Sequence, residues 1–176
     1  MRIKDIVTIG MLSALLIAVQ VFLAFLPNVE LVSLLIILFT LLLRKRTLLI
    51  IMTFILLEGF IYGFGLWWMN YLYIWFVLYF ITRIFKKEQS PFFWAMIAGA
   101  FGLTFGALCS IPYLFMGWFN GSFQTGIHSA IAYWISGIPF DITHGISNFF
   151  IVLFLFKPLY YILNNVVTKE SYLEND

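Results

Sequence analysis

The stretch LVSLLIILFTLLLRKRTLLIIMTFILLEG, residues 31–59, sets three consecutive cations between two apolar runs. A cation triplet between two such runs is typical of a short loop that joins two membrane-spanning helices. The same alternation of apolar runs and basic clusters extends along the rest of the chain. Its ten Lys and Arg residues are Arg2, Lys4, Arg44, Lys45, Arg46, Arg83, Lys86, Lys87, Lys157 and Lys169.

If the apolar segments cross a bilayer as six helices, all ten cations lie on one side of it. Positive charge is retained in the cytoplasm during insertion, so this side and both termini are predicted to be cytoplasmic. The predicted fold class is therefore an all-α membrane protein with six transmembrane helices in a single domain, 1–176. The spans are expected near 6–25, 29–43, 47–65, 69–85, 92–115 and 140–163. The second span is short, and we expect it to extend through Arg44 by snorkelling.

Composition agrees with a membrane class. Hydrophobic residues make up 63% of the chain and charged residues 10%, whereas soluble domains average about 45–50% and about 25%. No cleavage site follows the first apolar segment, so we expect this segment to be retained as a span. The single cysteine, Cys109, excludes an intrachain disulfide and gives no Cys-based metal site. No metal, cofactor or nucleic-acid partner is predicted.

The connection between the fifth and sixth spans, 116–139, contains several glycines and polar residues. Its apolar stretch at 130–135 is too short to cross a bilayer. We expect a loop with a short helix that covers the outer mouth of the bundle. His128 is expected to be a loop residue, and Pro139 is expected to begin the sixth span.

Four ionisable residues fall in the outer halves of the predicted spans, where such side chains are costly and usually functional. They are Glu30, Glu58, Asp141 and His144. Asp141, His144 and Asn148 recur at i, i+3 and i+7, so they share one helical face. Structural alternatives remain for three of the four ionisable residues: an interfacial position for Glu30, a helix-dipole role for Asp141, and a pairing of His144 with Asp141.

Aromatic residues accompany these polar groups between the third and fourth spans. Tyr62, Trp67, Trp68 and Tyr71 lie here together with Asn70. An interfacial aromatic belt is the alternative explanation for them. Their density near buried carboxylates, an amide and an imidazole favours a pocket for a planar heterocyclic ligand, which needs ring faces to stack on and edges to bond to.

Small residues form two stripes. Gly10, Ala14 and Ala18 recur every four residues in the first span, and a similar stripe runs from Ala98 to Ser110 in the fifth. Small side chains permit close helix approach in lipid. For the fifth span we favour packing within the bundle. For the first span, packing within the bundle and docking of another membrane subunit both remain open.

The chain resembles the substrate-binding S component of energy-coupling factor (ECF) transporters over its whole length. Four segments carry the resemblance: the Ala14-Leu-Leu-Ile-Ala18 stripe, 28–32, 58–71 and 137–148. The resemblance implies a six-helix bundle that captures a vitamin from outside and docks, through the stripe, on a membrane coupling subunit driven by two ATPase subunits. The chain itself has no G-x-x-x-x-G-K-[ST] loop, so it is not expected to hydrolyse ATP by that route.

The predicted function is high-affinity capture of a vitamin or vitamin precursor at a bacterial plasma membrane. The substrate candidates are a cobalamin-type corrinoid, favoured by the many aromatic loop residues, and hydroxymethylpyrimidine or another thiamine precursor. Two alternatives from other classes are an intramembrane enzyme that uses Asp141 and His144 as an acid–base pair, and an accessory subunit that binds no ligand. The predicted site residues are Glu30, Glu58, Tyr62, Trp67, Trp68, Asn70, Tyr71, Asp141, His144 and Asn148.

Overall fold

The computed structural model describes the backbone of residues 3–172 and the side chains of residues 3–166. Two cations of the predicted topology, Arg2 and Lys169, lie outside the described side chains. All regular structure within the described residues is α-helical, which confirms the all-α class. The helices are α1 (Ile3–Leu23), α2 (Val32–Leu43), α3 (Arg46–Tyr62), α4 (Leu66–Ile84), α5 (Pro91–Leu103), α6 (Phe105–Cys109), α7 (Ile111–Asn120) and α8 (Phe123–Tyr172).

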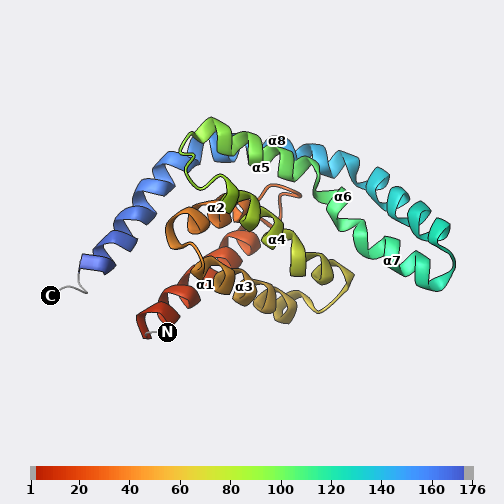
Figure 1. The fold of residues 1–176 in the computed structure, drawn as a ribbon, viewed down its shortest axis with the longest axis horizontal. Helices are drawn as coiled ribbons and strands as arrows, with labels where there is room; N and C mark the ends of the chain where they lie inside the picture. Colours follow the sequence, from red (N-terminus) through yellow and green to blue (C-terminus); the bar gives the residue numbers. More distant parts are fainter. Residues whose placement is uncertain (1–2, 173–176) are drawn as a thin grey trace.

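Helix α2 lies at the centre of the first four helices and contacts α1, α3, α4 and α8 (Figure 1). Ten of its twelve residues are buried. At about 1.5 Å per residue its length is about 18 Å, well short of a bilayer's ~30 Å hydrocarbon core. The helix does not extend through Arg44, contrary to our expectation, because this residue adopts a positive φ of 54° and ends the helical backbone at Leu43.

Helix α8 runs for 50 residues and arches over the bundle, with α5, α6 and α7 packed along it (Figure 1). The arch contains Pro139 and Pro158, and helices bend at proline because its backbone nitrogen cannot donate the usual hydrogen bond. Pro139 therefore lies inside a continuous helix. The expectation that it begins the sixth span is wrong.

The predicted fifth span is broken. The backbone leaves the helical ladder at Thr104, and residues 105–120 continue at 44° to α5. The hydroxyl group of Thr104 donates a shared hydrogen bond to two backbone carbonyl oxygens, of Ala100 at 2.9 Å and of Phe101 at 3.2 Å. Such local side-chain bonding competes with the helical backbone pattern and bends helices.

The region 116–139, which we expected to be a loop with a short helix, is a helical hairpin. Helix α7 ends at Asn120, and α8 begins at Phe123, with two residues between them. The glycines that had indicated a loop instead allow the two helices to touch: a Cβ atom on Gly117 would lie 2.7 Å from Cα of Gly126. His128 is accordingly an exposed residue on α8. The hairpin projects from one end of the molecule (Figure 1).

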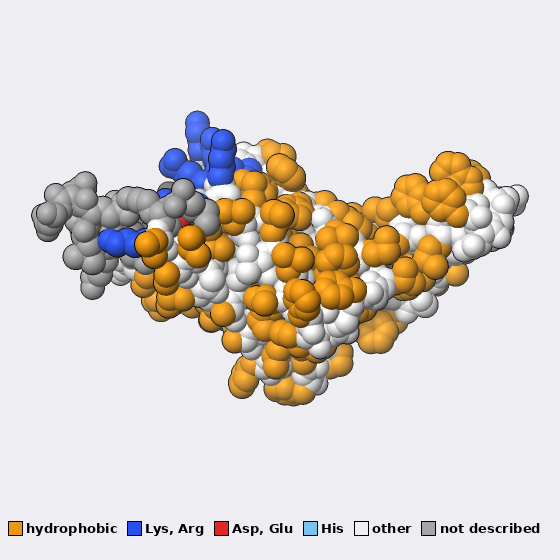
Figure 2. All heavy atoms as spheres, turned by 90° about the horizontal axis from the view of Figure 1, so that it is seen from below, with side chains coloured by type: hydrophobic (Ala, Val, Ile, Leu, Met, Phe, Trp, Pro, Cys, Tyr) orange, Lys and Arg blue, Asp and Glu red, His pale blue; other side chains and the backbone are white. Residues whose placement is uncertain are grey.

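The surface is that of a helical membrane protein. Large hydrophobic side chains are exposed on every described helix longer than five residues except the central α2, and they cover the face in Figure 2. By length and composition, two described helices can cross a bilayer, Ile3–Leu23 and Phe123–Val166, and a third if the bent pair 91–120 counts as one span. The Lys and Arg side chains visible in Figure 2 gather at one end.

The two small-residue stripes face different surroundings. In α5 and α6, Ala98, Gly102 and Gly106 are buried against α8; a Cβ atom on Gly102 would lie 2.8 Å from the Gly145 backbone. In α1, Gly10, Ala14 and Ala18 are exposed. Ala14 and Ala18 line a shallow apolar groove between α1 and α3, with a volume of about 600 Å³.

Candidate ligand-binding site

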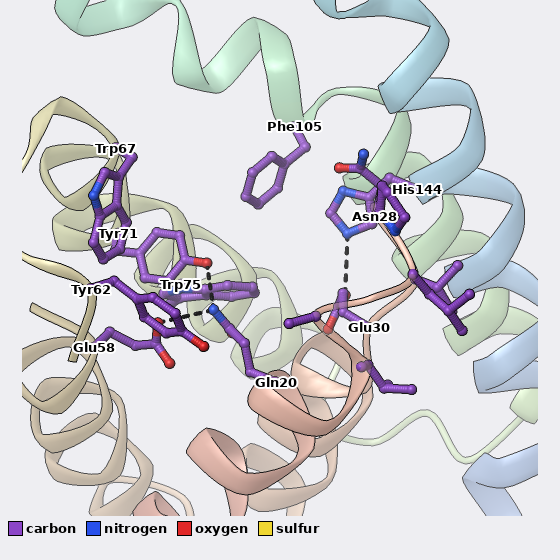
Figure 3. Close-up of a pocket in the computed structure, with 15 residues that line it drawn as sticks. Gln20, Asn28, Glu30, Glu58, Tyr62, Trp67, Tyr71, Trp75, Phe105 and His144 are labelled. Carbon is purple, nitrogen blue, oxygen red and sulfur yellow. Dashed lines mark hydrogen bonds and ion pairs between the residues drawn. The ribbon is translucent and has the colours of Figure 1, made fainter.

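A cavity of about 460 Å³ opens among α1, the α1–α2 loop, α3, α4, α6 and α8 (Figure 3). Its α1 and α3 residues come from the C-terminal ends of these helices, and its α4 residues from the N-terminal half. The cavity is therefore at the opposite end of the bundle from the Arg44–Arg46 turn. It is lined by Gln20, Leu23, Ala24, Leu26, Pro27, Asn28, Val29, Glu30, Glu58, Tyr62, Trp67, Tyr71, Trp75, Phe105 and His144.

On one wall, three helices meet at the side chain of Gln20. Its amide nitrogen donates to Glu58 Oε2 at 3.1 Å and to the Tyr71 hydroxyl at 3.0 Å. Glu58 is fully buried, and its Oε1 atom has no hydrogen-bond partner within the part of the chain that the structure describes. A buried carboxylate oxygen without a partner is strongly unfavourable, so this wall has an unused acceptor.

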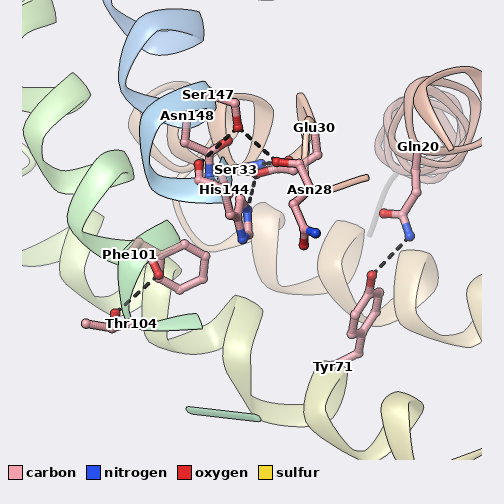
Figure 4. A network of polar contacts seen from close by, with 10 residues as sticks. All are labelled: Gln20, Asn28, Glu30, Ser33, Tyr71, Phe101, Thr104, His144, Ser147 and Asn148. Carbon is pink, nitrogen blue, oxygen red and sulfur yellow. Dashed lines mark hydrogen bonds and ion pairs between the residues drawn. The ribbon is translucent and has the colours of Figure 1, made fainter. Parts of the chain in front are cut away.

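On the opposite wall, Glu30 is held by neighbours from α2 and α8 (Figure 4). Its Oε2 accepts the Ser33 backbone N–H at 2.8 Å, and its Oε1 lies 3.2 Å from His144 Nε2. Behind them, the Asn148 amide donates to the Ser33 hydroxyl at 3.3 Å. Both oxygens of Glu30 thus have partners, and the carboxylate of Glu58 is the one with spare bonding capacity.

Aromatic rings make up much of the remaining lining. Trp67, Tyr71 and Trp75 recur every four residues on one face of α4, with neighbouring ring centroids 5.3 and 5.4 Å apart. Trp75 is 2% exposed, and its indole N–H has no acceptor. Phe105 packs edge-on against the His144 ring at 4.8 Å. The cavity therefore combines flat apolar surfaces with an unpaired donor and an unpaired acceptor.

Asp141 supports this cavity from outside its lining. Its Oδ1 accepts the Gly106 backbone N–H at 2.8 Å, an N–H that the break at Thr104 leaves without a helical partner. This bond fixes the start of α6, and so the neighbouring Phe105, whose ring faces the cavity (Figure 3). Of the structural alternatives, the pairing of His144 with Asp141 is not the hydrogen bond that forms, since His144 pairs with Glu30 instead.

Six of the ten predicted site residues line the cavity: Glu30, Glu58, Tyr62, Trp67, Tyr71 and His144. The other four are directed elsewhere. Trp68 donates to the Ile55 carbonyl at 2.8 Å, and Asn70 accepts from the Tyr73 hydroxyl at 3.0 Å. Asp141 and Asn148 lie behind the walls, although both share the buried face of α8 with His144.

The predicted site did not include Gln20, Trp75, Phe105 or the α1–α2 loop residues other than Glu30. For two of these residues, the sequence contained a pattern that could have placed them in the site. Gln20 is an amide in the outer half of a span, the property that identified Asn70, and Trp75 continues the spacing of Trp67 and Tyr71 by one further turn. Phe105 had no such pattern, because the chain has 21 phenylalanines and its helix break was not expected.

No cluster of three or more metal-ligating side chains occurs among the described residues. Comparison with known proteins identifies no relative: no family model matches the chain, and neither does any curated protein or solved structure. The fold and the cavity therefore define a class only, a helical membrane protein with an open, largely aromatic cavity.

Proposed function

We propose that the chain is the substrate-binding subunit of a membrane transporter, similar to the S component of an ECF transporter. In this role it captures a vitamin or vitamin precursor from outside the cell. It then delivers this ligand to a membrane coupling subunit driven by two ATPase subunits. The observation that carries the proposal is the open cavity with buried polar atoms, in Glu58 and Trp75, that have no partner among the described residues.

The proposal includes six spans with both termini in the cytoplasm. Retention of the basic loops inside the cell would orient the bundle with the Arg44–Arg46 turn in the cytoplasm. The cavity, at the other end of α1 and α3, would then open outward. An outward site suits a subunit that captures its ligand before any ATP is used.

The size of the cavity bears on the choice of substrate. About 460 Å³ is in the lower part of the roughly 300–1,000 Å³ range that accommodates drug-sized ligands. A corrinoid is a macrocycle that is larger than a drug-sized ligand. The volume therefore supports the smaller candidate, hydroxymethylpyrimidine or another thiamine precursor, over the corrinoid that the aromatic loops had favoured.

The small-residue stripe on α1 supports the proposed docking on a membrane coupling subunit. Gly10, Ala14 and Ala18 are exposed on the surface of the bundle. The groove beside Ala14 and Ala18 is apolar, and its lining contains no charged side chain. Such a surface allows a helix of another membrane subunit to approach closely.

The test is ligand binding by the purified full chain. We expect one compound of a vitamin and precursor panel to raise the thermal midpoint saturably and to be recovered unchanged. Phe105→Ala, which removes a ring from the cavity, should weaken binding. Phe154→Ala, the same substitution at an exposed position of α8, should not. Conversion of the bound compound would support the enzyme alternative. Failure to bind any compound, with a partner subunit still co-purified, would support the accessory subunit.

A further inference from the structure

The charges around the cavity are of one sign. Its lining contains two carboxylates, Glu30 and Glu58, and no Lys or Arg. His144 is the one other ionisable group of the lining besides the tyrosines, and it is already engaged by Glu30. An anionic ligand would meet carboxylates without a balancing cation, and like charges at a binding surface oppose association. The lining thus selects against carboxylate and phosphate groups.

Of the two carboxylates, Glu58 is the one that still needs a partner. Glu30 is bonded through both oxygens, whereas Glu58 has a single neutral donor, Gln20, on Oε2. Its buried Oε1 has none. A cationic N–H group of a ligand would supply both the missing hydrogen bond and the missing positive charge, and charge-assisted bonds are the stronger kind.

The aromatic walls favour the same kind of ligand. The rings of Trp67, Tyr71 and Trp75 succeed one another along the face of α4 next to Glu58 (Figure 3). Aromatic faces carry partial negative charge and attract cations, with tryptophan the best of them. Neighbouring rings are nearly perpendicular, with interplanar angles of 90° and 83°, so a flat ligand would stack on one of these rings and meet the edge of the next.

We infer that the ligand is a flat organic cation with N–H donors, such as an amidinium or a protonated amino-heterocycle. Its charged end lies against Glu58, and its ring stacks on one of the three rings of Trp67, Tyr71 and Trp75. This inference rests on the proposed function, because it requires the cavity to bind a solute. It goes further by fixing the charge and the donor pattern of that solute.

The test uses three probes of the same size and shape that differ in charge: benzamidine, benzamide and benzoate. Their affinities for the full chain in nanodiscs are measured by saturation-transfer NMR and by tryptophan fluorescence. We expect benzamidine, a cation, to bind at least about tenfold more tightly than benzoate, with benzamide between them. Glu58→Gln, which keeps the shape of the side chain, should reduce benzamidine affinity at least about tenfold and leave benzamide affinity nearly unchanged.

Glu88→Gln is the matched control. Glu88 lies in the α4–α5 loop outside the cavity, where it accepts the backbone N–H groups of Gln89 and Ser90, and its removal should leave all three affinities unchanged. Benzoate or benzamide binding as tightly as benzamidine would overturn the charge inference while leaving the cavity as a binding site. If none of the probes binds at millimolar concentration, the charge inference is overturned, whereas the proposed function is decided separately by the vitamin and precursor panel.

Discussion

Gln20 is the residue on which the Glu58 wall of the cavity depends. Its amide is the one described donor to Glu58, and it also reaches Tyr71. Gln20→Leu should leave both oxygens of a buried carboxylate without partners, which costs about 1–3 kcal/mol. We expect the free energy of unfolding to fall by this amount, as measured by SDS-induced unfolding of the purified protein.

A double substitution separates the interaction from the loss of packing. Gln20→Leu combined with Glu58→Leu removes both polar groups, and an apolar pair can be nearly neutral when no unpaired group is left behind. The double variant should therefore be more stable than Gln20→Leu alone, with a coupling energy of about 0.5–3 kcal/mol. Simple additivity of the two single changes would show that Gln20 and Glu58 do not interact.

Gly102 tests the contact between α5 and α8. A Cβ atom there would lie 2.8 Å from backbone atoms of Gly145 and His144, neither of which can move as a side chain can. Gly102→Ala should lower the free energy of unfolding by about 1–3 kcal/mol through overpacking. Gly137→Ala is the matched control, since no atom lies within 4 Å of the new methyl group. Equal stability of the two variants would contradict the close helix contact.

Helix α1 presents its small residues outward, and a bulky substitution there tests whether a partner uses them. Ala14→Trp should abolish co-purification with a coupling subunit, because close helix approach is lost. Affinity of the solitary chain for its ligand should change by less than about tenfold, or 1.4 kcal/mol, as the cavity lining does not include Ala14. Phe154→Trp, at an exposed position of α8, serves as the control. Joint loss of ligand and partner binding would contradict this separation of roles.

The boundaries of the helices could be predicted from the sequence to different extents in the two halves of the chain. Arg44 and Lys45 indicated a turn, and the structure separates α2 from α3 there, because charged side chains are excluded from apolar helices. Gly117 and Gly126 were misleading. Glycine serves both loops and close helix contacts, and a single sequence does not reveal which helix will lie opposite.

The site was less predictable than the helices for a related reason. Glu58 and His144 could be proposed because ionisable groups are rare at membrane depth. The sequence could not indicate that Glu30 would be the partner of His144, since 114 residues separate them. Nor could it reveal that Asp141 would bind Gly106, a contact created by the break at Thr104.

The whole molecule carries its visible cations at one end and its cavity at the other, which predicts opposite exposure of the two ends in a cell. In a Cys109→Ser background, a cysteine at Phe64 in the α3–α4 loop should react with a membrane-impermeant thiol reagent in intact cells. A cysteine at Gln89 in the α4–α5 loop should react only after the cells are permeabilised. Labelling in the reverse order would contradict the proposed orientation.

If the proposed function holds, the bridge made by Gln20 has a consequence for transport energetics. Gln20 lies two residues beyond Ala18, so α1 carries both the outward stripe and the hydrogen bonds that join it to α3 and α4 in one wall of the cavity. A partner that displaces α1 on docking would strain this bridge and alter the affinity of the ligand. Thermodynamic linkage then requires the ligand to alter the affinity of the partner by the same factor. A loaded and an empty subunit would therefore compete unequally for a shared coupling subunit.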